Sequence, residues 1–194
     1  MTELIMAGRP MADVEDTLRR YCGLPWSGGD PEVWAYAYFD AVQDDFPDEV
    51  MPVDVLAAAA VHPRLTRFDF AWFLERRGQL NDLLAHLPDI DLADADIGPL
   101  DSLPAVAGSG VDLSLLSKVL HRKRPKLVPM LDRSLTGWYR RQLSAQGASA
   151  WPELIRLLAS DLRANSHTLG DLQDIAPLTT LRIADISIWM SNQR

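Results

Sequence analysis

The chain has 194 residues, 47% of them hydrophobic and 24% charged, and its formal net charge is −8. A chain of this length and composition buries a sufficient core without a metal or a disulfide, and its one cysteine, Cys22, excludes an internal disulfide. The acidic total argues against a general nucleic-acid coat protein, because such domains are strongly basic. No apolar run approaches the roughly 20 residues of a membrane span, and we expect a cytoplasmic protein without membrane contact.

Helices are predicted along almost the whole chain. We expect residues 1–10 to form a loose arm and residues 11–194 to form one helical domain. The predicted N-caps include Thr66, Asp112, Asp132 and Thr179. The predicted helices are residues 11–22, a helix that starts at 31, and residues 52–61, 67–77, 79–87, 113–123, 133–146, 151–165, 169–175 and 180–192.

The pattern contains no convincing strand. No stretch of four or more residues alternates cleanly between apolar and polar, and no Asn-Gly or Asp-Gly turn is present to join two strands. Residues 92–104 are acidic and punctuated by proline, which favours a long loop. The sequence therefore predicts an all-α fold, a single globular domain of eight to ten short helices.

Positive charge is concentrated in one part of the chain. Residues 114–141, called the basic segment below, hold all three lysines and five arginines against a single acid, Asp132. The segment therefore carries +7, and a total of −8 leaves −15 for the remainder. A positive segment in a negative protein is a candidate surface for an anionic ligand.

The bases of the helix predicted at 113–123 have two interpretations. Lys118, His121 and Arg122 share one helical face, because their spacing is i, i+3 and i+4. With Lys123 and Arg124 they form a predicted phosphate- or carboxylate-binding group. Alternatively, these residues are a cationic last turn that complements the helix dipole and pairs with the many acids of the chain. The sequence leaves both interpretations open.

Metal and cofactor motifs are not evident. The four histidines do not share metal-ligand spacing on one helix, and Cys22 stands alone, so we expect no metal site. The sequence lacks a P-loop, a nucleophile elbow and a dinucleotide fingerprint. We therefore expect no cofactor.

Residues 103–135, LPAVAGSGVDLSLLSKVLHRKRPKLVPMLDRSL, join a glycine turn, a helix, a break and a Pro-x-x-Asp segment that opens another helix. This order resembles the core of the helix-hairpin-helix DNA glycosylase superfamily. The resemblance implies that Gly108 and Gly110 form a hairpin whose amides bind a phosphate, and that Asp132 lies in a base pocket. Val111 to Leu113 occupy the position of the family's lysine nucleophile, so that group is missing there, and Lys118 matches it poorly.

Asp132 and three aromatic residues are the remaining candidates. Asp132 is either the charge that stabilises a developing cation during cleavage of an N-glycosidic bond, or an N-cap, and one side chain can do both. Trp138 and Tyr139 stand beside arginines, as in base-stacking surfaces, and Trp72 lies in an aromatic helix. All three are predicted either to line a pocket or to belong to the core.

A second resemblance spans most of the chain. The phrases AWFLERRGQLNDLLAHLP, SKVLHRKRPKLVPMLDR and LRIADISIWM, between Ala71 and Met190, resemble the bacterial family called domain of unknown function 6308. It implies a shared helical fold and brings no activity. Three functions follow from the residues: a protein directed at nucleic acid or nucleotides, a non-catalytic module that docks an acidic partner, and a protein that binds or converts an anionic small molecule.

Overall fold

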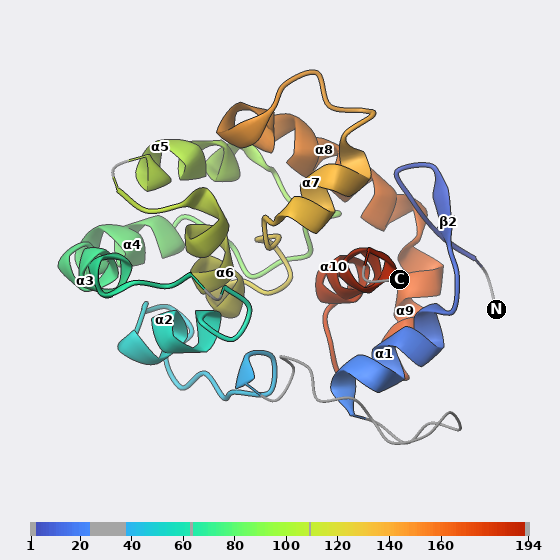
Figure 1. Cartoon of the computed structure of the whole chain (residues 1–194), viewed down its shortest axis with the longest axis horizontal. Coiled ribbons are helices and arrows are strands. Elements are labelled where there is room, and N and C mark those ends of the chain that lie inside the picture. The colour runs from blue at the N-terminus through green and yellow to red at the C-terminus, as the bar shows by residue number, and fades with distance from the viewer. Residues whose placement is uncertain (1–2, 24–37, 63, 109, 193–194) are drawn as a thin grey trace.

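Short α-helices account for most of the chain in the computed structural model, which describes residues 3–23, 38–62, 64–108 and 110–192 (Figure 1). Within these ranges the helices are α1 (Val14–Cys22), α2 (Pro52–Ala58), α3 (Arg67–Glu75), α4 (Arg77–Leu84), α5 (Leu103–Ala107), α6 (Leu113–Lys123), α7 (Arg133–Tyr139), α8 (Trp151–Ala164), α9 (Ser166–Gln173) and α10 (Thr180–Ser191). Two 3₁₀ turns are added, η2 (Gly98–Ser102) and η3 (Gly147–Ala150). The predicted fold of eight to ten short helices is confirmed, with one small sheet in addition.

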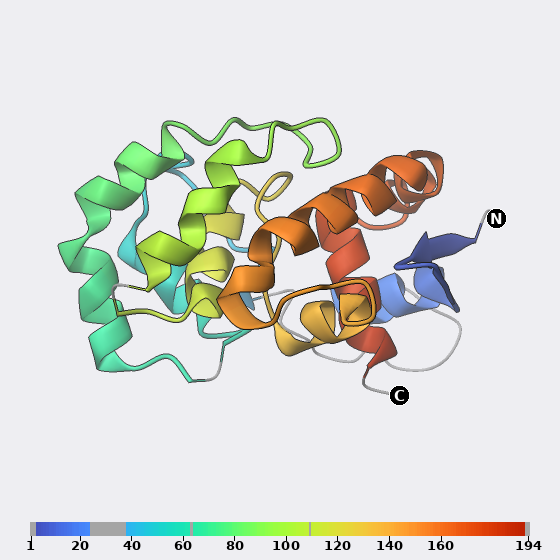
Figure 2. The ribbon, with the colours of Figure 1, turned by 90° about the horizontal axis from the view of Figure 1, so that it is seen from above.

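The helices form two groups that meet along one core. Figures 1 and 2 show α2 to α6 on one side, and α1 with α7 to α10 on the other. Helix α10 is the centre of the second group and packs against α1, α7, α8 and α9. None of the helices in the described ranges combines the length and apolar character that a membrane span requires.

Side-chain caps start four of these helices as the sequence predicts. Thr66, Asp112, Asp132 and Thr179 each accept a hydrogen bond from an amide in the first turn of the helix that follows. Each bond satisfies a backbone N–H group that has no partner within the helix. The starts of α3, α6, α7 and α10 are therefore determined locally.

The absence of strands was predicted wrongly. Strands β1 (Leu4–Met6) and β2 (Arg9–Met11) pair antiparallel and form a hairpin where we expected a loose arm. The two turn residues, Ala7 and Gly8, have φ angles of 54° and 70°. Alanine is unfavourable in this left-handed region, which is why the turn did not match a hairpin signal.

Contacts far along the chain hold this hairpin in place. The amide side chain of Asn165 accepts from the backbone N–H of Ile5 and donates to the carbonyl of the same residue. The Asp161 carboxylate accepts from the N–H of Ala7 at 2.6 Å and from the hydroxyl of Tyr139 at 2.7 Å. Asp161 on α8 and Asn165 directly after it therefore stabilise a hairpin turn that its own sequence does not favour.

Several predicted boundaries also differ from the structure. Residues 92–104 were predicted as a loop, but they contain η2 and the start of α5. Pro104 does not prevent this helix, because it lies in the first turn of α5, where the backbone nitrogen needs no hydrogen-bond partner. Helix α7 ends at Tyr139, seven residues before its predicted end at 146. The helix predicted to start at 31 lies mostly outside the described residues.

The last two residues of α6, Arg122 and Lys123, hold the segment 39–54. The guanidinium of Arg122 contacts Asp54 at 3.0 Å and the carbonyl of Phe39 at 2.7 Å. The Lys123 ammonium lies 2.7 Å from both Asp44 and Asp54. Asp54 is fully buried and also accepts from the backbone N–H of Met51. We call these contacts of Arg122 and Lys123 with Asp54 the Asp54 clamp.

A second buried ion network ties α10 to α1. The Arg182 guanidinium contacts Asp40 at 2.6 Å, pairs with Asp185 one turn along α10 and donates to the hydroxyl of Tyr21. Burial raises the pKa of the Tyr21 hydroxyl far above its ordinary value. That hydroxyl therefore stays protonated and donates to Asp40 at 2.6 Å.

The Asp54 clamp predicts a large difference between two aspartates. Replacing Asp54 by Asn should lower the free energy of unfolding by about 3–5 kcal/mol, because Arg122 and Lys123 would each lose a buried counter-charge. Asp48 also pairs with a basic-segment residue, Arg124, but its side chain is 78% exposed. Asp48→Asn should therefore cost less than about 1 kcal/mol. Urea unfolding followed by tryptophan fluorescence measures both, and equal losses would contradict the buried clamp.

Candidate pocket between α6 and α7

An open pocket of about 670 Å³ lies where the two helix groups meet, and we call it the α6–α7 pocket. One wall comes from the end of α5, the glycine turn and the first half of α6. The opposite wall comes from residues 131–136 at the start of α7, and residues 61–64 close one side. Its polar lining residues are His62, Arg64, Asp112, Ser114, Lys118, Asp132, Arg133 and Thr136.

Asp132 is both a cap and a pocket residue. One carboxylate oxygen accepts from the amide of Leu135 at 2.7 Å and starts α7. The other oxygen makes no hydrogen bond to any residue in the described part of the chain. The two predicted roles of Asp132 are thus geometrically compatible, because the cap needs only one of the two oxygens.

Lys118 lies deep in the same pocket. Lys118 is only 5% exposed, and its ammonium donates to the hydroxyl of Ser114 at 2.9 Å. Burial lowers the pKa of Lys118, while the charge of Asp132 opposes that shift. An ammonium has three N–H donors, and Ser114 is the one acceptor within the described residues. Lys118 therefore has hydrogen-bonding capacity that a pocket ligand can use.

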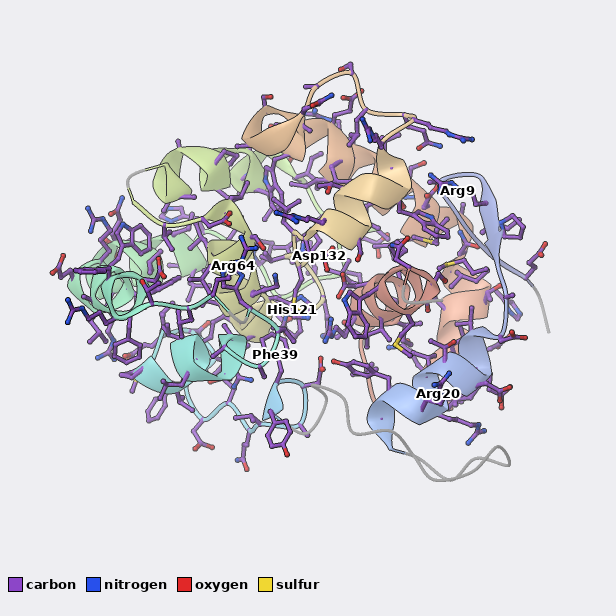
Figure 3. The ribbon with its side chains drawn as sticks, viewed as in Figure 1. Arg9, Arg20, Phe39, Arg64, His121 and Asp132 are labelled. Carbon is purple, nitrogen blue, oxygen red and sulfur yellow. The ribbon has the colours of Figure 1, made fainter. Side chains whose placement is uncertain are left out.

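Residues that the sequence analysis did not assign to a site complete the wall. Arg64 and Arg133 are exposed at the pocket, and His62 is half-buried. Burial lowers the pKa of His62, and the nearby Lys118 charge lowers it further. Arg64 and Asp132 are labelled near the middle of Figure 3. His62 and Arg64 belong to no motif and reach α6 only through the fold, so no sequence signal could have identified them.

A third acid lies behind the pocket on α10. Asp185 is buried and pairs with Arg182. Burial raises the pKa of Asp185 to about 7, and the negative charge of Asp132 contributes to that shift. Asp185 and Asp132 therefore influence one another electrostatically, although Asp185 does not line the pocket.

The five predicted anion-binding bases are separated in the structure. Lys118 lines the α6–α7 pocket, whereas His121 and Arg122 line a different hollow of about 250 Å³ near the start of α10. Arg122 and Lys123 belong to the Asp54 clamp. The Arg124 side chain donates to the carbonyls of Leu84 and Leu87 and to Asp48. The side chains of Arg122, Lys123 and Arg124 therefore pair with acids of the same chain, as the second of the two interpretations expected.

The glycine turn does not present the two predicted amides. The N–H of Gly108 donates to the carbonyl of Pro104, and the N–H of Gly110 donates to that of Ala107, both at 3.0 Å. Gly110 has a φ of 134°, and a Cβ there would lie 3.2 Å from the Trp72 ring. Glycine at 110 therefore serves the turn and its close contact with α3. Gly108 still lines the pocket.

None of the three predicted pocket aromatics lines the α6–α7 pocket. Trp72 is buried and packs edge-on against Phe73 at 5.1 Å between ring centroids. The Trp138 indole donates to the carbonyl of Met6. Tyr139 is fully buried and donates to Asp161. These rings hold the core and the hairpin. Trp72 and Tyr139 are therefore core residues, whereas Trp138 is half-buried and packs against the core while it holds the hairpin.

Metal ligation has no support in the described ranges, where no group of three or more His, Cys, Asp or Glu side chains is placed to hold an ion.

Comparison with known protein families matches residues 14–192 to a family of unknown function, DUF6308. The chain belongs to this family. Comparisons with curated proteins and with solved structures found no match. The family assignment confirms the resemblance to domain of unknown function 6308, and the likeness to helix-hairpin-helix glycosylases stays a prediction.

His121 makes stability depend on pH. Its Nδ1 lies 2.7 Å from the carbonyl of Val128, and its ring stacks on Phe39 at 6.1 Å between centroids. Complete burial, assisted by the charge of Arg182, lowers the pKa of His121 from 6.5 to about 4. The folded state therefore favours neutral His121. Its stabilising contribution is complete above pH 6.5, and about 3 kcal/mol is lost as the pH falls to 4, at about 1.4 kcal/mol per pH unit.

The test compares the wild type with His121→Gln, whose amide can still donate to Val128. Between pH 7 and pH 4, the free energy of unfolding of the wild type should fall by about 3 kcal/mol more than that of the variant. Asp185 acts in the opposite direction, because its raised pKa makes the folded state favour its neutral form. Asp185 is present in both proteins, so its contribution cancels in the difference. Parallel pH profiles would show that His121 is not a buried neutral group.

Proposed function

We propose that the α6–α7 pocket binds a nucleotide unit and hydrolyses its N-glycosidic bond. The observation that carries this proposal is that Lys118 and Asp132, of opposite charge, line one pocket and each retain unused hydrogen-bonding capacity. The pocket volume of about 670 Å³ lies in the range of small-molecule sites. The glycosylase resemblance of residues 103–135 supports the same reaction class.

The chemistry assigns separate tasks to the two charges. Loss of the base leaves positive charge on the sugar ring, and the free oxygen of Asp132 would stabilise that charge. The base leaves with the electron pair of the broken C–N bond, and the oxygen of a water molecule forms a new bond to the sugar carbon. The proton that this water loses ends on the departing base, so that the products are a free base and a sugar with a hydroxyl group. The buried Lys118 ammonium would hold a phosphate or another acceptor of the substrate.

The phosphate contacts in this proposal differ from those expected from the sequence. Arg64 and Arg133 are exposed at the pocket wall and replace Arg122, Lys123 and Arg124, which pair internally. Such exposed arginines suit phosphate oxygens, because a guanidinium binds two of them at once.

A small anionic metabolite is the second candidate ligand. The observation in its favour is the buried ammonium of Lys118, which suits a carboxylate as well as a phosphate. Docking of an acidic protein on Arg122 to Arg124 receives no support from the geometry, because those side chains contact Asp44, Asp48, Asp54 and backbone carbonyls.

Binding is tested first, by fluorescence anisotropy of labelled single- and double-stranded oligonucleotides and by competition with free nucleotides. The affinity should fall steeply with salt, since each phosphate contact releases counterions. Lys118→Met, which keeps the apolar part of the side chain, should weaken binding about tenfold or more, as expected for a lost charge-assisted hydrogen bond. Absence of binding at low salt would exclude the proposed function, and a metabolite screen would follow.

Catalysis is tested with matched substitutions of two N-caps. Asp132→Asn removes the charge but keeps an oxygen that caps α7, and should lower release of free base by about 100-fold or more. Asp112→Asn is the control, because Asp112 also caps a helix at the same pocket by accepting from Ser114. The control should retain activity, with thermal unfolding confirming that both variants fold. Equal losses in the two variants would indicate a structural effect.

A further inference from the structure

An exposed aromatic side chain lies close to the pocket in sequence and in space. Phe68, in the first turn of α3, is 72% exposed. It follows Arg64, which lines the pocket, by four residues. The Cα atoms of Arg64 and Phe68 are therefore at most about 14 Å apart. A large apolar ring with this exposure is costly in water unless it has a partner.

The start of α3 is fixed beside the pocket. Thr66 and Asp69 form a reciprocal capping box, in which Thr66 accepts from the amide of Asp69 and the Asp69 carboxylate accepts from that of Thr66. The charge of Asp69 also acts on His62 in the pocket wall. The first turn of α3 therefore presents its outward side chains from a rigid position near the pocket.

Cations accompany the exposed ring. The guanidinium carbon of Arg67 lies 4.8 Å from the centroid of the Phe68 ring. Both Arg64 and Arg67 are exposed. An aromatic face interleaved with arginines is the pattern that holds a nucleic-acid strand, with the ring stacking on a base and the cations contacting phosphates.

We infer that Arg64, Arg67 and Phe68 form a rim that binds single-stranded nucleic acid next to the pocket. The ligand of the pocket is then one unit of a DNA or RNA strand, and Phe68 stacks on a neighbouring base. This inference rests on the proposed function and narrows its substrate class from nucleotides to strands. The rise along a stacked strand is about 3.4 Å per nucleotide, so a reach of up to about 14 Å covers the next few units.

An apolar partner is the competing occupant. Leu56 on the neighbouring α2 and Leu74 at the far end of α3 are also exposed, so the alternative to a strand is an apolar contact of Phe68 with a second copy of the chain. The charges favour the strand, because Arg67 lies over the Phe68 ring and Arg64 precedes that ring by four residues, whereas an interface between two identical copies would bring these like charges together.

The experiment measures binding to the full chain of labelled oligo-dT and oligo-U, each twelve nucleotides long. Binding of dTMP and UMP is measured by competition. Phe68→Ala should weaken binding of the oligonucleotides by about fivefold to a hundredfold, which is the range for one stacked base. Binding of the mononucleotides should not change. Leu74→Ala is the matched control, because Leu74 is 45% exposed and lies about 9 Å further along α3. The control should bind as the wild type does.

The other outcomes overturn the inference in distinguishable ways. If the wild type binds mononucleotides, and Phe68→Ala binds oligonucleotides as tightly as Leu74→Ala and the wild type do, the rim does not exist and the proposed function stands. If neither ligand binds the wild type, both proposals fail. Light scattering gives the oligomeric state, and a wild-type dimer that Phe68→Ala converts to a monomer would assign the surface to a second copy.

Discussion

The burial of Asp54 between Arg122 and Lys123 is the constraint on which the arrangement of the first helix group depends. An isolated carboxylate cannot be buried without a large loss of solvation, so the two bases of α6 must stay with it. Since the same bases also hold the Phe39 carbonyl and Asp44, the segment 39–54 is attached to the C-terminal end of α6. The position of α6 is thereby determined at one end, and its first half is left to form the wall of a pocket.

Two lysines of α6 show how similar residues acquire different roles. Lys118 and Lys123 are both almost completely buried. Lys123 lies 2.7 Å from each of two carboxylates, which balance its charge within the protein. Lys118 donates a hydrogen bond only to a serine hydroxyl among the described residues, and its pKa is lowered by burial. Burying an ammonium without a bonded counter-charge is costly, and proteins accept that cost mainly where a ligand or a reaction uses the charge. This contrast distinguishes Lys118 from the structural bases.

Local chemistry predicted the helix starts, because a cap such as Asp112 or Thr179 acts within three residues of its own position. The same reasoning placed Asp132 correctly at the start of α7. It could not find the hairpin, whose Ala-Gly turn depends on Asn165 and Asp161 more than 150 residues away. It also could not choose between surface and internal roles for Arg122, Lys123 and Arg124, because their acidic partners Asp44, Asp48 and Asp54 lie about 70 to 80 residues earlier in the chain and no local pattern links them to α6. Partners distant in sequence, rather than local preference, decide these features.

An acidic protein can offer a site for anions where the residues around a pocket carry a local excess of positive charge. Asp112 and Asp132 both line the pocket, but each gives one oxygen to a backbone amide at a helix N-terminus, where the helix dipole favours negative charge. Lys118, Arg64 and Arg133 have no such internal use of comparable strength in the described residues. The charged lining residues therefore sum to +1, from three bases and two acids, whereas the whole chain carries −8. Because the Debye length is about 8 Å at physiological salt, distant acids repel a ligand there only weakly. In the proposed site, attraction of an anion would therefore arise from these few side chains and not from the protein as a whole.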